Sequence, residues 1–87
     1  MPYTYIVQCA DGSFYTGWTT DLENRLQVHN DGKGARYTRS RRPVRLVYLE
    51  VHPNRSEAQR REATVRRLRR DQKEALVSAF KDAKLQI

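Results

Sequence analysis

The chain reads YTYIVQCADGSFYTGWTTDLENRLQVH from residue 3 to residue 29. Residues 3–9 alternate and contain aromatic and β-branched side chains, a pattern that predicts a strand. The Asp-Gly pair at residues 11–12 is typical of a tight hairpin turn, because both residues tolerate a positive φ. Residues 14–18 are then the predicted antiparallel partner, and this hairpin leads directly into a helix.

The predicted helix carries an arginine and a histidine on one side. It begins after Thr20 or Asp21, which are good capping residues, and runs to about residue 30. Arg25 and His29 are four residues apart and therefore project from the same side. In one interpretation both lie in solvent, with Arg25 paired to Asp21 and His29 covering the helix end. In the other, the guanidinium and the adjoining tyrosines cradle a phosphate, because arginine presents planar, paired donors.

One more strand and two more helices follow the first helix. A mostly apolar run predicts a third strand at residues 43–51. Ser56 with Gln59 matches a capping box, which predicts a helix over about residues 57–69, and a last helix is predicted over about residues 71–82. The predicted fold is therefore α+β, a three-stranded antiparallel sheet flanked by helices in the order ββαβαα. We expect a single domain that spans all 87 residues.

Charge and cysteine content limit the possible functions. The chain has 17 Lys and Arg against 10 Asp and Glu, a net charge of +7. This excess favours a polyanionic partner, above all nucleic acid, although ribosomal association or a basic face without a partner stays open. Cys9 is the only cysteine, which excludes an internal disulfide or a zinc cluster built on thiolates, and we expect it to be buried. Without a signal peptide or an apolar run near ~20 residues, we expect a cytoplasmic protein with no membrane contact.

Glu62 lies on the apolar side of the predicted helix after Ser56. Ala58, Val65 and Leu68 form the rest of this side. A carboxylate there is costly unless it is paired or binds a metal ion. One interpretation is an internal salt bridge to an arginine. The other is a ligand for Mg²⁺ or a similar ion, since such ions bind one or two carboxylates together with substrate phosphates.

A basic segment, residues 33–45, contains no acidic residue. Its cations and its single aromatic residue are Lys33, Arg36, Tyr37, Arg39, Arg41, Arg42 and Arg45. Cations interleaved with an aromatic ring predict a loop that binds backbone phosphates, with one stacking contact. A second cluster comprises Arg60, Arg61, Arg66, Arg67, Arg69 and Arg70. Such charge runs are often only solvated faces, but two of them flanking a candidate metal site favour nucleic-acid binding.

Together these residues resemble the GIY-YIG nucleases. The first family motif corresponds to Tyr3-Thr4-Tyr5, without its glycine, and the second corresponds to Tyr15-Thr16-Gly17. The family's arginine and histidine on the first helix correspond to Arg25 and His29, and its metal-binding glutamate corresponds to Glu62. The segments at residues 32–38 and 42–48 are similar to those of small stand-alone bacterial members, and the resemblance covers nearly the whole chain.

The resemblance implies a reaction and a role for each residue. The family hydrolyses DNA phosphodiester bonds with an activated water and one divalent ion, Mg²⁺ or Mn²⁺. By this resemblance Glu62 holds the ion, and Arg25 steadies the scissile phosphate. Tyr5 and Tyr15 position or deprotonate the water, although a phenol with its usual pKa of ~10 is a base only if positive charge lowers that pKa. His29 assists through a hydrogen bond to a tyrosine or to the phosphate.

Three functions fit these features. The first is a small endonuclease that selects single-stranded, duplex or branched DNA by structure rather than sequence, with a role in DNA repair or recombination. The second is a basic nucleic-acid-binding module whose catalysis is weak or lost. The third is a nuclease subunit that needs a partner protein. The completeness of the site favours the enzyme, because a binder needs the arginines but neither Glu62 nor the tyrosines.

Overall fold

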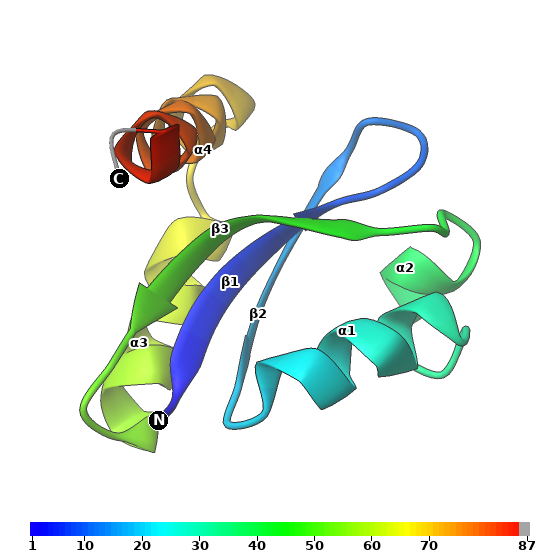
Figure 1. Ribbon diagram of the computed structural model, residues 1–87, viewed down its shortest axis with the longest axis horizontal. Coiled ribbons are helices and arrows are strands. Elements are labelled where there is room, and N and C mark those ends of the chain that lie inside the picture. The colour runs from blue at the N-terminus through cyan, green and yellow to red at the C-terminus, as the bar shows by residue number, and fades with distance from the viewer. Residues whose placement is uncertain (86–87) are drawn as a thin grey trace.

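The computed structural model describes residues 1–85, with side chains described as far as residue 83 (Figure 1). Its elements are β1 (Tyr3–Gln8), β2 (Phe14–Thr19), α1 (Leu22–Asn30), α2 (Arg36–Arg39), β3 (Arg45–Val51), α3 (Arg55–Arg66) and α4 (Arg70–Leu85). The predicted α+β class and the order ββαβαα are confirmed, and the one-turn helix α2 is an addition within the segment predicted as a loop. The predicted domain ends at residue 87, and residues 86–87 lie outside the described part.

Strand β1 is the centre of the sheet, whose strand order is β2-β1-β3 with both pairs antiparallel. Tyr5, Ile6 and Val7 are each at most 1% exposed, because β1 is covered on both edges and both faces. The register places Tyr5 opposite Gly17 and Val7 opposite Tyr15. The hairpin predicted from the Asp-Gly turn is thus confirmed, and it brings the two tyrosines to the same face of the sheet.

Helices cover both faces of the sheet, with α1 and α2 on one side and α3 and α4 on the other (Figure 1). On the first side, Leu22 and Leu26 pack against the buried residues of β1 and against Cys9, which is buried as predicted. On the second side, the Thr4 hydroxyl donates a hydrogen bond to the Ala58 carbonyl at 2.8 Å and so joins β1 to α3. None of the described helices combines the length and the apolar character needed to cross a membrane.

Helix α3 begins two residues earlier than the capping box predicts. Asn54 has an extended backbone, and its Oδ1 atom accepts a hydrogen bond from the Glu57 N–H at 2.9 Å, so Asn54 is the capping residue. Ser56, the predicted cap, lies inside the first turn. Both residue types cap helices well, so residue type alone does not distinguish Ser56 from Asn54. As a result Arg55 becomes the first residue of α3.

Candidate active site

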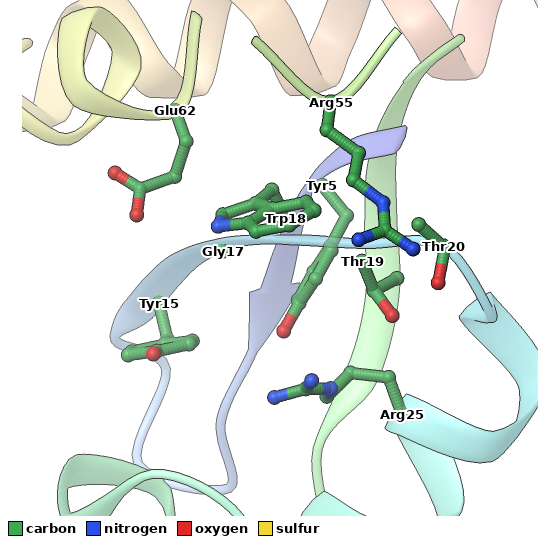
Figure 2. Close-up of a pocket in the computed structure, with 9 residues that line it drawn as sticks. All are labelled: Tyr5, Tyr15, Gly17, Trp18, Thr19, Thr20, Arg25, Arg55 and Glu62. Carbon is green, nitrogen blue, oxygen red and sulfur yellow. The ribbon is translucent and has the colours of Figure 1, made fainter. Parts of the chain in front are cut away.

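An open cavity of about 340 Å³ lies beside β2, the edge strand of the sheet. The cavity is lined by Tyr5, Tyr15, Gly17, Trp18, Thr19, Thr20, Arg25, Arg55 and Glu62 (Figure 2). These residues come mainly from β1, β2, α1 and α3, so the fold collects side chains that are far apart in the sequence. Two predicted catalytic tyrosines, the predicted phosphate-binding arginine and the predicted metal ligand therefore share one cavity.

Tyr5 passes over Gly17, its partner in the hairpin. A Cβ atom added at Gly17 would lie 2.5 Å from the Tyr5 Oη atom and 2.6 Å from its Cζ atom, closer than side chains approach each other in folded proteins. Glycine is therefore required here by the close approach of the ring. The glycine of the second motif makes room for the phenol of the first motif.

Gly17→Ala is expected to lower the free energy of unfolding by about 1–3 kcal/mol, because the added methyl group displaces a buried ring. Denaturant unfolding followed by circular dichroism measures the change. Gly12→Ala is the comparison: Gly12 has a φ of +86° and open space around the added carbon, so its cost of about 1–2 kcal/mol is backbone strain alone. Only Gly17→Ala should also change the near-ultraviolet dichroism of the tyrosines. Unchanged stability of Gly17→Ala would show that the ring moves aside without cost.

His29 is completely buried behind Tyr5 and does not line the cavity. Its Nε2 atom lies 2.9 Å from the Tyr5 Oη atom, and its Nδ1 atom lies 2.9 Å from the Thr38 Oγ1 atom. The Thr38 hydroxyl donates its single proton to the Ala35 carbonyl at 2.9 Å, so it accepts a hydrogen bond from the His29 Nδ1–H. The Nε2 atom is then unprotonated and accepts the Tyr5 O–H. The interpretation that leaves His29 in solvent is wrong, because Tyr5 and the α2 region enclose the ring.

Burial lowers the pKa of His29 below its usual value, and the positive charge of Arg25 lowers it further. Folding therefore favours the neutral imidazole, which the hydrogen bonds to Tyr5 and Thr38 also require. An unfolded chain binds a proton at this histidine near pH ~6.5, whereas the folded chain does so only at lower pH. The unfolded state thus binds more protons in this range, and stability must fall as the pH drops through it.

We expect the free energy of unfolding to decrease between about pH 7.5 and about pH 5.5, and His29→Gln to reduce this decrease. Denaturant titrations at several pH values in this window measure how steeply the free energy of unfolding of each protein changes with pH. The window stays above the usual pKa of carboxyl groups, so that acidic residues contribute little. If the free energy of unfolding changes equally with pH in wild type and in His29→Gln, the pH dependence belongs to other groups.

The phenol of Tyr5 keeps its proton. Burial raises its pKa well above the usual value of about 10, and the nearby Tyr15 raises it further. Arg25 acts in the opposite direction but with a smaller effect than burial. Positive charge therefore does not turn this phenol into a base, and Tyr5 is suited to orient a water molecule rather than to deprotonate it.

Tyr15 is held by aromatic contacts with α1 and α2. Its ring centroid lies 5.4 Å from that of His29 in an edge-to-face arrangement and 6.2 Å from that of Tyr37 in a stacked arrangement. The guanidinium carbon of Arg41 lies 3.9 Å from the Tyr37 centroid, and Arg41 is paired with Asp11 at 3.0 Å. Tyr37 thus supports Tyr15, and the ring face beneath Arg41 is not open to a nucleic-acid base.

Arg25 is exposed and projects from α1 into the cavity (Figure 2). The alternative partner expected for it, Asp21, instead caps α1 by accepting a hydrogen bond from the Asn24 N–H at 3.2 Å. Arg25 forms no ion pair with any residue that the structure describes. Its donors are therefore open to an anion that enters the cavity.

Glu62 is the acidic residue that lines the cavity, and its side chain is 13% exposed. Its Oε1 atom accepts a hydrogen bond from the Arg66 Nη2 atom at 2.6 Å, one turn further along α3. This contact is the salt bridge that the sequence left open as an alternative. It occupies one oxygen of a carboxylate that still borders the cavity.

The donors around Glu62 fit a hard divalent cation. Such ions prefer oxygen ligands, and the carboxylate shares its cavity with two phenol side chains. Within residues 1–83, no three His, Cys, Asp or Glu side chains gather as they do in a cage built by the protein alone. A single carboxylate is sufficient for Mg²⁺ or Mn²⁺, because these ions take further ligands from water and substrate phosphates.

The basic segment divides into cations whose side chains donate hydrogen bonds within the fold and cations whose side chains do not. The arginines that donate hydrogen bonds to neighbouring atoms of the fold are Arg41, Arg42 and Arg45. The exposed cations of this segment that form neither a side-chain hydrogen bond nor an ion pair within the described chain are Lys33, Arg36 and Arg39. The last three are the better candidates for phosphate contacts.

The second arginine cluster is largely neutralised by neighbouring acids. Ion pairs of 2.6–3.3 Å involve Arg60, Arg61, Arg66, Arg69 and Arg70. Arg67 is the cluster member that lacks such a pair within the described residues. This cluster therefore resembles the solvated face that the sequence left open more than a phosphate-binding surface.

Four further residues line the cavity that the sequence did not identify as site residues, namely Arg55, Trp18, Thr19 and Thr20. A signal for Arg55 was present, since it precedes Glu62 by seven residues, which is two turns of a helix and hence the same side. No comparable spacing identifies the two threonines, of which Thr19 is the last residue of β2 and Thr20 lies in the connection to α1.

A sequence model described as the GIY-YIG catalytic domain matches residues 1–75. This range contains the tyrosine hairpin, Arg25, His29 and Glu62. The chain belongs to the GIY-YIG family, a family of nucleases whose members generally use divalent metal ions.

The relatives of the chain include UPF0213 proteins. One from Clostridium perfringens is 53% identical over 79 residues, which cover 91% of this chain and 85% of the relative. One from Halobacterium salinarum is 50% identical over 76 residues, which cover 87% of this chain and 99% of the relative. A UPF0213 protein from Bacillus halodurans with a solution structure is 51% identical in sequence. The two structures match with a TM-score of 0.58 over 91% of this chain and 85% of that one. A protein from E. faecalis with a solution structure is 46% identical in sequence. The two structures match with a TM-score of 0.59 over 91% of this chain and 84% of that one.

Proposed function

We propose that the chain is an endonuclease that hydrolyses DNA phosphodiester bonds and depends on one divalent ion, Mg²⁺ or Mn²⁺, held at Glu62. The proposal rests on one observation: Tyr5, Tyr15, Arg25 and Glu62 line the same open cavity. Together they offer a metal ligand, a phosphate-binding guanidinium and hydroxyl groups that orient water. We further propose a cytoplasmic enzyme that selects DNA by structure rather than sequence, as repair or recombination requires.

Arg25 donates paired N–H groups to the non-bridging oxygens of the scissile phosphate. It thereby stabilises the negative charge that grows as the bond from phosphorus to the leaving oxygen breaks. Tyr15 orients the attacking water, whose oxygen forms the new bond to phosphorus while one of its protons passes to solvent, and the leaving oxygen takes up a proton from solvent. When bound, the divalent ion polarises the phosphate and makes the water more acidic.

Tyr5 also orients the water, but as a hydrogen-bond acceptor. Its O–H is donated to the neutral His29, so the lone pairs of its oxygen remain open to a water hydrogen. Because its pKa is raised, Tyr5 does not take up the proton that the water loses. His29 acts through Tyr5 and is a positioning residue.

The exposed cations Lys33, Arg36 and Arg39 contact the DNA backbone in this proposal. Phosphate contacts carry no sequence information, and this favours selection by DNA shape. Such contacts also make binding strongly salt-dependent, because each neutralised phosphate releases counterions.

A cleavage assay tests the proposal. The substrates are labelled single-stranded, duplex and branched DNA, and RNA, each incubated with Mg²⁺, with Mn²⁺ and with chelator. We expect at least one DNA substrate to be cut when the metal is present and to remain uncut in chelator. Cutting that persists in chelator, or cutting of RNA alone, would overturn it.

The second candidate is a nucleic-acid-binding module without turnover. The ion pair between Glu62 and Arg66 favours it, because a carboxylate already neutralised at 2.6 Å is a weaker metal ligand. Tight binding of all the DNA substrates without cleavage in either metal would select this candidate. Cleavage that appears only with a cell extract would instead select the subunit that needs a partner protein.

A further inference from the structure

Arg55 is the first residue of α3 and lines the cavity that also contains Arg25 and Glu62. Its side chain is exposed. In Figure 2 the guanidinium of Arg55 is directed toward Thr19 from one side, and Arg25 reaches the cavity from α1 on the other side of Thr19. Two guanidinium groups from two helices therefore enter one cavity.

The positive charge of Arg55 has no partner within the described chain. The other arginines of α3 pair with acids: Arg60 with Glu57, Arg61 with Glu50 and Arg66 with Glu62. A cation at the first position of a helix also lies near the partial positive charge of the helix N-terminus, which disfavours it. Neither an ion pair nor the helix dipole stabilises Arg55, so its donors are open to an anion that enters the cavity.

We propose that Arg55 binds a second phosphate of the DNA backbone, next to the phosphate held by Arg25. The inference rests on the proposed function, because it takes the anion in the cavity to be nucleic acid. A nucleic-acid strand offers one negative charge per nucleotide, so two neighbouring guanidinium groups match two successive phosphates. The strand then crosses the edge of the sheet between the start of α1 and the start of α3, and Arg55 contributes to binding but not to bond breaking.

Two properties of an Arg55→Gln variant distinguish a phosphate contact from a structural role. Affinity for labelled DNA is expected to fall about tenfold, the usual contribution of one charge-assisted contact. The slope of log affinity against log salt is expected to shrink by ~0.7–0.9, the contribution of one neutralised phosphate. Arg55→Lys should keep the wild-type slope, because it retains the charge, but not the full affinity.

Fluorescence anisotropy in chelator, over a series of salt concentrations, measures binding without cleavage. Arg60→Gln is the matched control on the same helix, since Arg60 pairs with Glu57 and does not line the cavity. It removes the same charge and is expected to leave the slope unchanged. Circular dichroism verifies that each variant is folded.

The outcomes separate the inference from the function on which it rests. If wild type binds DNA and Arg55→Gln has the wild-type slope, the second phosphate contact is overturned and the nuclease stands. If the slopes change as expected but wild type never cleaves DNA in either metal, the contact stands and the nuclease is overturned. If wild type does not bind DNA, both are overturned. A loss of kcat at saturating DNA as large as that of Arg25→Ala would also overturn the inference, because it would assign Arg55 to the scissile phosphate.

Discussion

Glu62→Gln is expected to reduce metal-dependent DNA cleavage by a factor of about 10²–10³ while the protein stays folded. A glutamine has the same shape, but a neutral amide is a poor ligand for a hard cation. The variant also loses the ion pair with Arg66, whose partly exposed position on one helix limits the cost to about 0.5 kcal/mol. Single-turnover cleavage over a range of Mn²⁺ concentrations measures the first effect, and thermal unfolding measures the second.

Two matched variants separate metal binding from the ion pair. Arg66→Gln removes the partner of Glu62 and keeps the carboxylate, so cleavage should persist and should need less metal, since no guanidinium competes for the oxygen. Glu74→Gln removes an ion pair of the same spacing, to Arg70 at 3.0 Å, away from the cavity, and should change nothing. Full activity in Glu62→Gln, or an equal loss in Arg66→Gln, would contradict the assignment of Glu62 as the metal ligand.

Arg25→Ala is expected to lower kcat by about 10²–10³, because in the proposed function the guanidinium stabilises the charge that develops on the scissile phosphate. Stability should change by less than about 0.5 kcal/mol, since Arg25 is exposed and has no ion pair within the described chain. Steady-state cleavage across DNA concentrations separates kcat from KM, and Arg25→Lys should recover only part of the loss, because lysine lacks the paired donors.

Arg67→Ala is the control for this loss. Arg67 is also an exposed arginine without an ion pair in the described chain, but it lies at the end of α3, outside the cavity. The same reduction of charge there should leave kcat unaltered. If Arg25→Ala raises KM and leaves kcat intact, Arg25 binds the DNA equally well before and during the reaction and does not stabilise the transition state.

Features that depend on neighbouring residues in the chain follow from the sequence. Alternation over residues 3–9 and the Asp-Gly turn predict the hairpin, because a period of two and a short turn leave few alternatives. Helical spacing likewise places Glu62 with Ala58 and Val65, which are both fully buried. Tyr5, Tyr15 and Glu62 lie on these two elements, and the sequence therefore identifies them as candidate site residues.

Contacts between distant segments do not follow from the sequence in this way. Arg41 has the pattern of a phosphate contact, yet it pairs with Asp11, 30 residues earlier, and covers Tyr37. His29 has the pattern of an exposed helix end, and only the fold of the α2 region shows that it is buried. The spacing of Arg55 and Glu62 places both on one side of α3, but only the packing of α3 beside β2 shows that this side borders the cavity.

The hydrogen bonds from Tyr5 through His29 to Thr38 have a consequence for protein engineering. Any redesign of residues 33–39 that aims at a new DNA preference also acts on the phenol at the cavity wall. Gly34 is restricted in the same way, because an added Cβ atom would collide with the His29 ring. The positions that can be exchanged without touching this connection are Lys33, Arg36 and Arg39. Within this short segment, the residues proposed to contact DNA therefore alternate with residues that hold the Tyr5 phenol in place.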